Sequence, residues 1–238
     1  MLKKIDYSDY IIHDLKLDIW QFPLNSEFSS ASSLLSADES TRANRFHFDR
    51  HRRRFTIARA TCRLILARYL NTTPNDITFD YSKHGKPYIK GKHDIQFNLS
   101  HSGELALLAI GKKHHVGIDL EFFSGRPYEG IGKQLFSAKE LNDFKKVEPR
   151  LKSLVFFNIW AQKEAFIKAS GLGLAYPTKE FDVPIYPTTN QIIFDKLHNK
   201  NWQMLSFMPE VACSAAICFD PLIEELTYLN IKDIGSII

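Results

Sequence analysis

With 238 residues, of which 44% are hydrophobic and 24% charged, the chain is an ordinary globular sequence, long enough for one large domain or two small ones. Its 31 lysines and arginines against 27 aspartates and glutamates give a formal net charge of +4, which favours anionic partners without requiring a nucleic acid. Three cysteines with no Cys-x-x-Cys pair argue against a disulfide framework or a zinc site. No apolar run approaches the roughly 18 residues that span a bilayer. We therefore expect a cytoplasmic protein outside the membrane.

The first part of the chain is predicted to contain a strand and two helix starts. Residues 1–17 are basic but interrupt their apolar positions with Asp and His, so they lack the continuous apolar core of a signal peptide. A strand over 20–24 is followed by a Ser-rich loop that ends where Ser36 and Glu39 have the spacing of a capping box. Apolar residues at helical spacing then predict a helix over 55–69, whose beginning is crowded with arginines.

Four strands are expected next, because these segments alternate in polarity or form short apolar runs between turn residues. They are expected over 76–81, 94–99, 106–110 and 115–123. The sequence KHGKP between the first two is typical of a turn.

The second part of the chain begins with the same helix-start signal, since Ser137 and Glu140 again have capping-box spacing. A long helix is expected over 153–171, with Gly171 as its end. The remaining expected segments are strands over 202–207 and 210–219 and a Pro-bearing surface connection over 176–190.

The two parts align with each other. Residues 35–39 match 136–140, and 55–67 match 156–168, at one offset of about 101 residues without a gap. This pattern predicts an internal duplication and an α+β fold of two pseudo-symmetric halves, 1–115 and 116–238.

A pair of carboxylates in the sequence GIDLE is a candidate metal site. Asp119 and Glu121 are two residues apart on a predicted strand and therefore share one face. Like charges held close need a cation or a proton between them, and a set of oxygen ligands suits Mg²⁺. The alternative is a pair of solvated acids on an exposed strand face.

The predicted long helix carries a second candidate cluster. Trp160, Lys163, Glu164 and Lys168 are three or four residues apart in WAQKEAFIK, so an aromatic ring, a carboxylate and two ammoniums are expected on one flank. Glu164 and Lys168 could instead form only a surface ion pair.

Further candidates are suited to phosphate. Gly85 and Lys86 lie in the predicted turn, and Ser100 and His101 stand side by side in FNLSHSG. Consecutive strand residues point to opposite faces, and the segment lacks the Gly-x-Ser-x-Gly elbow, so this pair is better suited to donate hydrogen bonds to a phosphate than to act as nucleophile and base. The arginines that crowd the first long helix can bind phosphates or form a solvated face: Arg42, Arg45, Arg50, Arg52, Arg53 and Arg54.

The motifs GKP, FNLSHSG, GIDLE and WAQKEAFIKASGLGL, in this order and spacing, resemble the 4′-phosphopantetheinyl transferases of the long, surfactin-synthetase-activator type. The resemblance covers nearly the whole chain. It implies a monomer of two α+β halves with coenzyme A bound between them, the first half binding nucleotide and phosphate and the second carrying the metal and catalytic residues. The implied reaction moves the phosphopantetheine arm of coenzyme A onto a serine of an acyl or peptidyl carrier protein and releases 3′,5′-adenosine bisphosphate.

The resemblance also implies roles for individual residues. Asp119, Glu121 and Glu164 match the ligands of Mg²⁺, for which Mn²⁺ can substitute. Glu164 matches the base that takes the proton of the carrier serine, and Lys168 matches a residue that protonates or electrostatically supports the leaving phosphate. The residues expected to contact coenzyme A are Arg42, Gly85, Lys86, Pro87, Asn98, Ser100, His101, Asp119 and Lys168.

Two other functions remain open at this point. A Mg²⁺-dependent phosphodiesterase acting on a nucleotide such as coenzyme A would use the same groups but transfer to water. A nucleic-acid-binding module would explain RFHFDRHRRRF, but it leaves GIDLE and KEAFIK without a role, so we expect no nucleic-acid partner.

Overall fold

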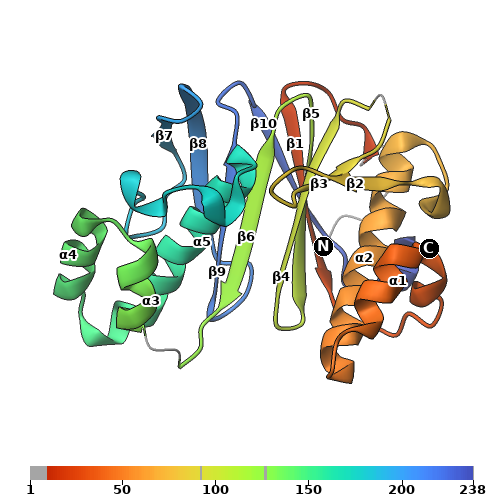
Figure 1. Ribbon diagram of the computed structural model, residues 1–238, viewed down its shortest axis with the longest axis horizontal. Helices are drawn as coiled ribbons and strands as arrows, with labels where there is room; N and C mark the ends of the chain where they lie inside the picture. The colour runs from red at the N-terminus through yellow and green to blue at the C-terminus, as the bar shows by residue number, and fades with distance from the viewer. Residues whose placement is uncertain (1–9, 92, 126–127, 238) are drawn as a thin grey trace.

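A computed structural model describes residues 10–91, 93–125 and 128–237 (Figure 1). Residues 1–9, on which the expectation of no signal peptide partly rests, lie outside this part of the chain. The strands are β1 Lys16–Pro23, β2 Phe79–Tyr81, β3 Pro87–Ile89, β4 Ile95–Ser102, β5 Leu105–Lys112, β6 Val116–Phe122, β7 Gln191–Asp195, β8 Lys200–Phe207, β9 Cys213–Phe219 and β10 Glu225–Asn230. The α-helices are α1 Ala37–Asn44, α2 Asp49–Leu70, α3 Tyr128–Leu135, α4 Ala138–Lys146 and α5 Lys152–Ser170.

Two four-stranded sheets form the centre of the protein, in the orders β10-β1-β5-β4 and β6-β9-β8-β7. The helices α1 and α2 lie on one side of them and α3, α4 and α5 on the other (Figure 1). The α+β prediction is confirmed.

Strand alternation explains why the sheets stack. In β5, Leu107 packs into a core shared by both sheets, whereas Leu108 packs under α2. In β6, Val116 and Ile118 face the shared core, so Gly117 and the alternate residues after it face α5. The layers are therefore α2, sheet, sheet and α5.

The predicted duplication appears in the strand order. The sequence β1-β5-β4 in the first sheet corresponds to β6-β9-β8 in the second, with antiparallel pairing throughout both sets. Both capping boxes are present, and each buries its glutamate: Glu39 receives Arg63 Nε at 2.8 Å, and Glu140 lies 3.0 Å from Lys163 Nζ. Each long helix thus holds its preceding short helix by a buried ion pair.

The sheets do not divide the chain at residue 115. β10 pairs in parallel with β1, with Leu226 opposite Leu17, so a segment of the second predicted half completes the first sheet. Leu229 and Ile231 also pack in the core under α2. The division into 1–115 and 116–238 remains a prediction about domains.

The connection over 176–190 is irregular, as expected, but it does not simply cross the surface. Tyr176, Phe181 and Val183 are buried against α5. Backbone carbonyls of this segment accept hydrogen bonds from α5, including Thr178 O from Lys163 Nζ at 2.7 Å. The prediction of a surface connection was therefore wrong, because the segment completes the core beside α5.

The cysteines and the helix lengths were also considered in the sequence. The cysteines Cys62, Cys213 and Cys218 are all buried and free. Within the described ranges, no helix has both the length and the apolar character needed to cross a membrane.

Candidate active site at the seam between the sheets

Polar side chains of β4 follow the edge of β6, where the two sheets meet. Asn98 Oδ1 accepts a hydrogen bond from Ile118 N at 2.8 Å, and Ser100 Oγ donates to Asp119 Oδ1 at 2.7 Å. One step further, Ser102 Oγ donates to Glu121 Oε2 at 3.2 Å. Because alternate residues of a strand share a face, this run of polar residues links the two edge strands and fixes both predicted carboxylates.

The last turn of α5 brings an ammonium to the same place. Lys168 Nζ lies 2.6 Å from Asp119 Oδ1 and donates to Ser100 Oγ at 3.0 Å and to Ile118 O at 3.3 Å. The Asp119 side chain is buried, while that of Lys168 keeps 26% of its exposure. Ser100, Asp119 and Lys168 form a compact group, which we call the seam cluster.

Gly117 explains how α5 approaches β6 so closely. A Cβ atom on this residue would lie 2.1 Å from Ala165 O and 2.3 Å from Ala169 N, so only glycine fits. The helix backbone therefore rests directly on the strand two residues before Asp119.

Glu164 lies one turn before Lys168 on α5, in the same electrostatic environment. Its pKa is raised, chiefly by burial and then by the negative charge of Asp119, while Lys168 acts in the opposite direction. A carboxylate whose pKa is raised is a stronger proton acceptor than an ordinary solvated carboxylate. The possible surface ion pair between Glu164 and Lys168 is replaced by the pair between Lys168 and Asp119.

Lys163 does not share this flank, contrary to the prediction. Its side chain is almost fully buried, lies 3.0 Å from Glu140 Oε1 and donates to the carbonyls of Thr178 and Phe181. Residues 163 and 164 are consecutive, so they leave the helix about 100° apart. Glu140 is therefore occupied by helix capping and by Lys163, and it is absent from the seam cluster.

The donor chemistry of the seam fits a magnesium ion held together with a substrate. Asp119 Oδ2 is buried and has no hydrogen-bond partner among the described residues. In the same part of the chain, no three His, Cys, Asp or Glu side chains are gathered closely enough to hold a metal ion by themselves. Mg²⁺ is commonly bound by one or two carboxylates and completed by waters and substrate phosphates. The three-carboxylate set Asp119, Glu121 and Glu164 stays a prediction.

Two adjoining pockets, each of about 210 Å³, open beside the seam cluster. They share the wall formed by Gly85, Pro87, Asn98 and Leu99. The first pocket is completed by Arg42, Phe55, Ala58, Arg59, Tyr81 and His101. The second is completed by His84, Lys86, Ile167, Lys168, Gly171 and Gly173. Most residues predicted to contact coenzyme A therefore line these pockets, while Ser100 and Asp119 lie in the seam cluster beside them.

Cations surround the first pocket. Partial desolvation lowers the pKa of His101, and the positive charges of Lys168, Arg54 and Arg42 lower it further against the opposing charge of Asp119. Such an environment favours an anionic ligand, because a bound anion offsets the excess positive charge.

The arginine-rich start of α2 is partly neutralised within the protein. Arg53 and Arg54 both donate to Glu104 Oε1, at 2.8 Å and 2.7 Å. Arg42 instead lies over the Phe55 ring, 5.2 Å from its centroid, at the wall of the first pocket. The arginines that were grouped in the sequence thus have different surroundings.

Sequence reasoning missed several residues of the pocket walls. Arg59 and Tyr81 both line the first pocket, and Arg59 Nη2 donates to Tyr81 Oη at 3.0 Å. A signal was present, because Arg59 is one helical turn after Phe55 and interrupts an otherwise apolar face. Leu99 and His84 carried no signal of their own.

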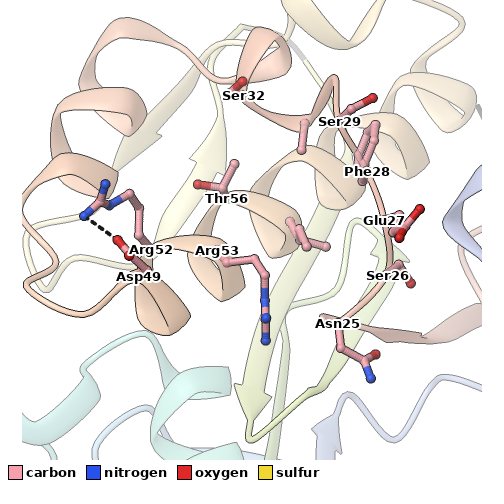
Figure 2. Close-up of a pocket in the computed structure, with 12 residues that line it drawn as sticks. Asn25, Ser26, Glu27, Phe28, Ser29, Ser32, Asp49, Arg52, Arg53 and Thr56 are labelled. Atoms are coloured by element: carbon pink, nitrogen blue, oxygen red, sulfur yellow. Dashed lines mark ion pairs between the residues drawn. The ribbon is translucent and has the colours of Figure 1, made fainter.

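Another pocket, of about 660 Å³, lies apart from this site (Figure 2). It is lined by residues 25–29, Ala31 and Ser32 and by the beginning of α2, with Arg53 and Thr56 on the helix side. Arg52 and Asp49 form an ion pair at 2.9 Å in its wall. Arg52 and Arg53, two of the candidate phosphate-binding arginines, line this pocket, whereas no residue expected to contact coenzyme A or Mg²⁺ does.

Comparison with known proteins identifies the family. Residues 18–113 match the family described as 4′-phosphopantetheinyl transferase, N-terminal, and residues 115–216 match the 4′-phosphopantetheinyl transferase superfamily. The chain is 36% identical over 212 residues to 4′-phosphopantetheinyl transferase HetI of Nostoc sp., covering 85% of this chain and 86% of that protein.

Two more distant relatives carry the same type of name. Identity to 4′-phosphopantetheinyl transferase Sfp of Bacillus subtilis is 30% over 165 residues, covering 69% of this chain and 73% of the relative. The L-aminoadipate-semialdehyde dehydrogenase-phosphopantetheinyl transferase of Mus musculus is 30% identical over 201 residues, covering 76% of this chain and 65% of the relative. This chain therefore belongs to the 4′-phosphopantetheinyl transferase superfamily.

Proposed function

We propose that this protein transfers the 4′-phosphopantetheine moiety of coenzyme A to a serine of an acyl or peptidyl carrier protein, converting the carrier from its apo to its holo form. The observation that carries this proposal is the seam cluster, in which Lys168 Nζ lies 2.6 Å from Asp119 Oδ1 beside two pockets with cationic walls. Membership of the superfamily supports the same reaction.

In this proposal the two pockets receive the nucleotide end of coenzyme A. The Arg42 guanidinium and a ring N–H of His101 would donate hydrogen bonds to its phosphate oxygens. Gly85 and Pro87 line both pockets. Because Gly85 has no side chain, the backbone of this turn can come close to a bound base or ribose. Asn98 lines both pockets while its Oδ1 accepts from Ile118 N, so its position is fixed before a ligand binds.

The transfer step requires one proton to move and one bond to break. Oxygen of the carrier serine attacks the phosphorus that bears pantetheine, its proton goes to Glu164, and the bond from that phosphorus to 3′,5′-adenosine bisphosphate breaks. The raised pKa of Glu164 suits it to accept this proton. Lys168 supports the negative charge on the leaving phosphate, as Ser100 and Asp119 hold its ammonium in place.

Magnesium is part of the proposal. Asp119, Glu121 and Glu164 would hold it together with waters and oxygens of the substrate, with Mn²⁺ as a substitute, and it would neutralise charge on the pyrophosphate. The buried, unpartnered Oδ2 of Asp119 supports this assignment. We further propose that the protein acts as a monomer with halves 1–115 and 116–238.

The amounts of released nucleotide and of holo carrier distinguish transfer to a carrier protein from hydrolysis of coenzyme A. The release of 3′,5′-adenosine bisphosphate is measured by chromatography in mixtures of enzyme, coenzyme A and Mg²⁺, with and without an apo carrier protein. A transferase releases the nucleotide only with carrier present, in equal amount to the holo carrier formed, and a chelator stops the release. Release without carrier would mean that water is the acceptor and that the protein is a phosphodiesterase.

A further inference from the structure

Lys86 belongs to a turn of the first half, but its ammonium lies against two elements of the second. The side chain donates to Val116 O at the start of β6 at 2.9 Å and to Lys168 O in the last turn of α5 at 2.7 Å. The turn itself is closed by Ser82 N donating to Lys86 O at 2.9 Å. A single ammonium therefore joins the turn, a strand and a helix end.

The carbonyl that Lys86 meets on α5 is one that a helix leaves unsatisfied. Lys168 is within four residues of the helix end at Ser170, so its carbonyl has no intrahelical partner. The carboxyl end of a helix also carries partial negative charge, which a cation stabilises. Lys86 thus caps α5 from another part of the chain.

The capping ammonium is withdrawn from solvent. Burial lowers the pKa of Lys86 to about 8, and the partners that its hydrogen bonds reach are neutral carbonyls. A buried ammonium is costly unless its donors are satisfied. The two carbonyls accept from two of the three ammonium donors, so most of the hydrogen-bonding capacity of Lys86 is used within the protein.

The same contacts set the distance between the two sides of the pockets. The Lys168 carbonyl is held by Lys86, while the Lys168 ammonium holds Asp119. The turn that Lys86 anchors presents Gly85 and Pro87 to both pockets. Moving this turn away from α5 would therefore separate the proposed nucleotide wall from the seam cluster.

We infer that Lys86 is a positioning residue, whose ammonium fastens the turn over 82–86 to β6 and to the end of α5, rather than a ligand of a coenzyme A phosphate. Its effect on transfer rests on the proposed function. Its effect on the end of α5 does not, because the contacts exist in the protein without a substrate.

The test compares Lys86→Met with Lys83→Met, which removes an exposed lysine from the same turn. Hydrogen exchange is measured for the amides of residues 168–173 in the free proteins, and binding of coenzyme A and the transfer rate at saturating coenzyme A are measured separately. We expect Lys86→Met to speed exchange at the α5 end at least about tenfold and to lower kcat about 10- to 100-fold, since small misplacements at a reacting centre cost this much. The Kd for coenzyme A should change less than about threefold. Lys83→Met should behave as the unmodified protein.

Either of two results would overturn the inference. Unchanged exchange at residues 168–173 would mean that Lys86 does not hold the helix end. A rise in Kd of more than about tenfold with kcat unchanged would identify Lys86 as a phosphate ligand. If Lys86→Met does not fold, Lys86→Gln, which keeps a donor on a shorter side chain, should exchange faster at residues 168–173 than the unmodified protein, and an unchanged rate would overturn the inference. Failure of the unmodified protein to modify any carrier would count against the proposed function alone, because the exchange experiment needs no substrate.

Discussion

Replacement of Gly117 by alanine should disturb the site through the backbone of α5 rather than through any reacting group. The added Cβ would lie 2.1 Å from Ala165 O and 2.3 Å from Ala169 N. Strand and helix must separate by more than about 1 Å before these contacts reach ordinary van der Waals distances. Forcing an extra carbon into a packed core typically costs about 1–3 kcal/mol, and backbone atoms on both sides cannot rotate away, so we expect a loss of about 3 kcal/mol.

The same displacement moves Lys168 away from Asp119, because Gly117 precedes Asp119 by two residues and Ala169 follows Lys168 directly. A misplacement of this size at a reacting centre lowers activity by about 100-fold. Urea unfolding gives the free energy of unfolding, and the initial rate of holo carrier formation by the folded protein gives the activity.

Gly130→Ala is the matched control, since a Cβ there meets nothing within 4 Å. Residue 130 lies inside α3, so this change should leave activity intact and stabilise the protein by up to about 1 kcal/mol. A Gly117→Ala protein with full activity and with stability within about 0.5 kcal/mol of the unmodified protein would refute the reasoning, because it would mean that β6 and α5 are not in backbone contact.

Three further predictions follow from the buried charges. Asp119→Asn, which removes the negative charge that holds the Lys168 ammonium at 2.6 Å, should lower kcat/KM for coenzyme A by about 100-fold or more in a steady-state transfer assay. Glu140→Ala leaves the Lys163 ammonium buried without its carboxylate and should cost about 3–5 kcal/mol in urea unfolding, and a loss below about 1 kcal/mol would contradict that pairing. Burial lowers the pKa of Lys86 to about 8, against 10.5 in the unfolded chain, so between these two pH values the unfolded chain binds more protons than the folded protein. As pH rises through this window, the free energy of unfolding should therefore gain up to about 1.4 kcal/mol per pH unit from this group. Urea midpoints from pH 7.5 to 10 should therefore show a rise that Lys86→Met lacks, and an equal slope in both proteins would be the contrary result.

Local signals in the sequence predicted several helix ends, although α3 was not expected and α2 begins at Asp49 rather than at residue 55. The capping boxes at Ser36 and Ser137 mark the starts of α1 and α4, as expected, and Gly171 ends α5 in a left-handed conformation. These signals worked because helix ends are determined by residues within one turn. The offset between residues 55–67 and 156–168 also anticipated that each sheet would be covered by one long helix.

The strands that were missed depend on distant parts of the chain. β10 joins the first sheet by pairing with β1, more than 200 residues earlier in the sequence, and nothing within 225–230 identifies that partner. β3 begins at Pro87, and a proline within an apolar run argues against a strand. Sequence periodicity indicates that a segment forms a strand, but it does not show which other strand the segment pairs with.

The candidate site was predicted only in part, because its assembly also depends on contacts between distant segments. Residue spacing placed Asp119 and Glu121 on one strand face, and the structure adds Ser100 and Ser102 opposite them. Helical spacing alone could not decide whether Lys163 or Lys168 would face the strand. That choice depends on which side of α5 is covered by the 176–190 connection, which is a tertiary property.

The intact mass of an apo carrier protein tests the central claim most directly. The carrier is incubated with this enzyme, coenzyme A and Mg²⁺, beside a carrier whose acceptor serine is replaced by alanine. The account predicts a gain equal to one phosphopantetheine on the first carrier and none on the second. Unchanged mass across acyl and peptidyl carriers while coenzyme A is consumed would contradict the claim that this protein is a phosphopantetheinyl transferase acting on carrier serines.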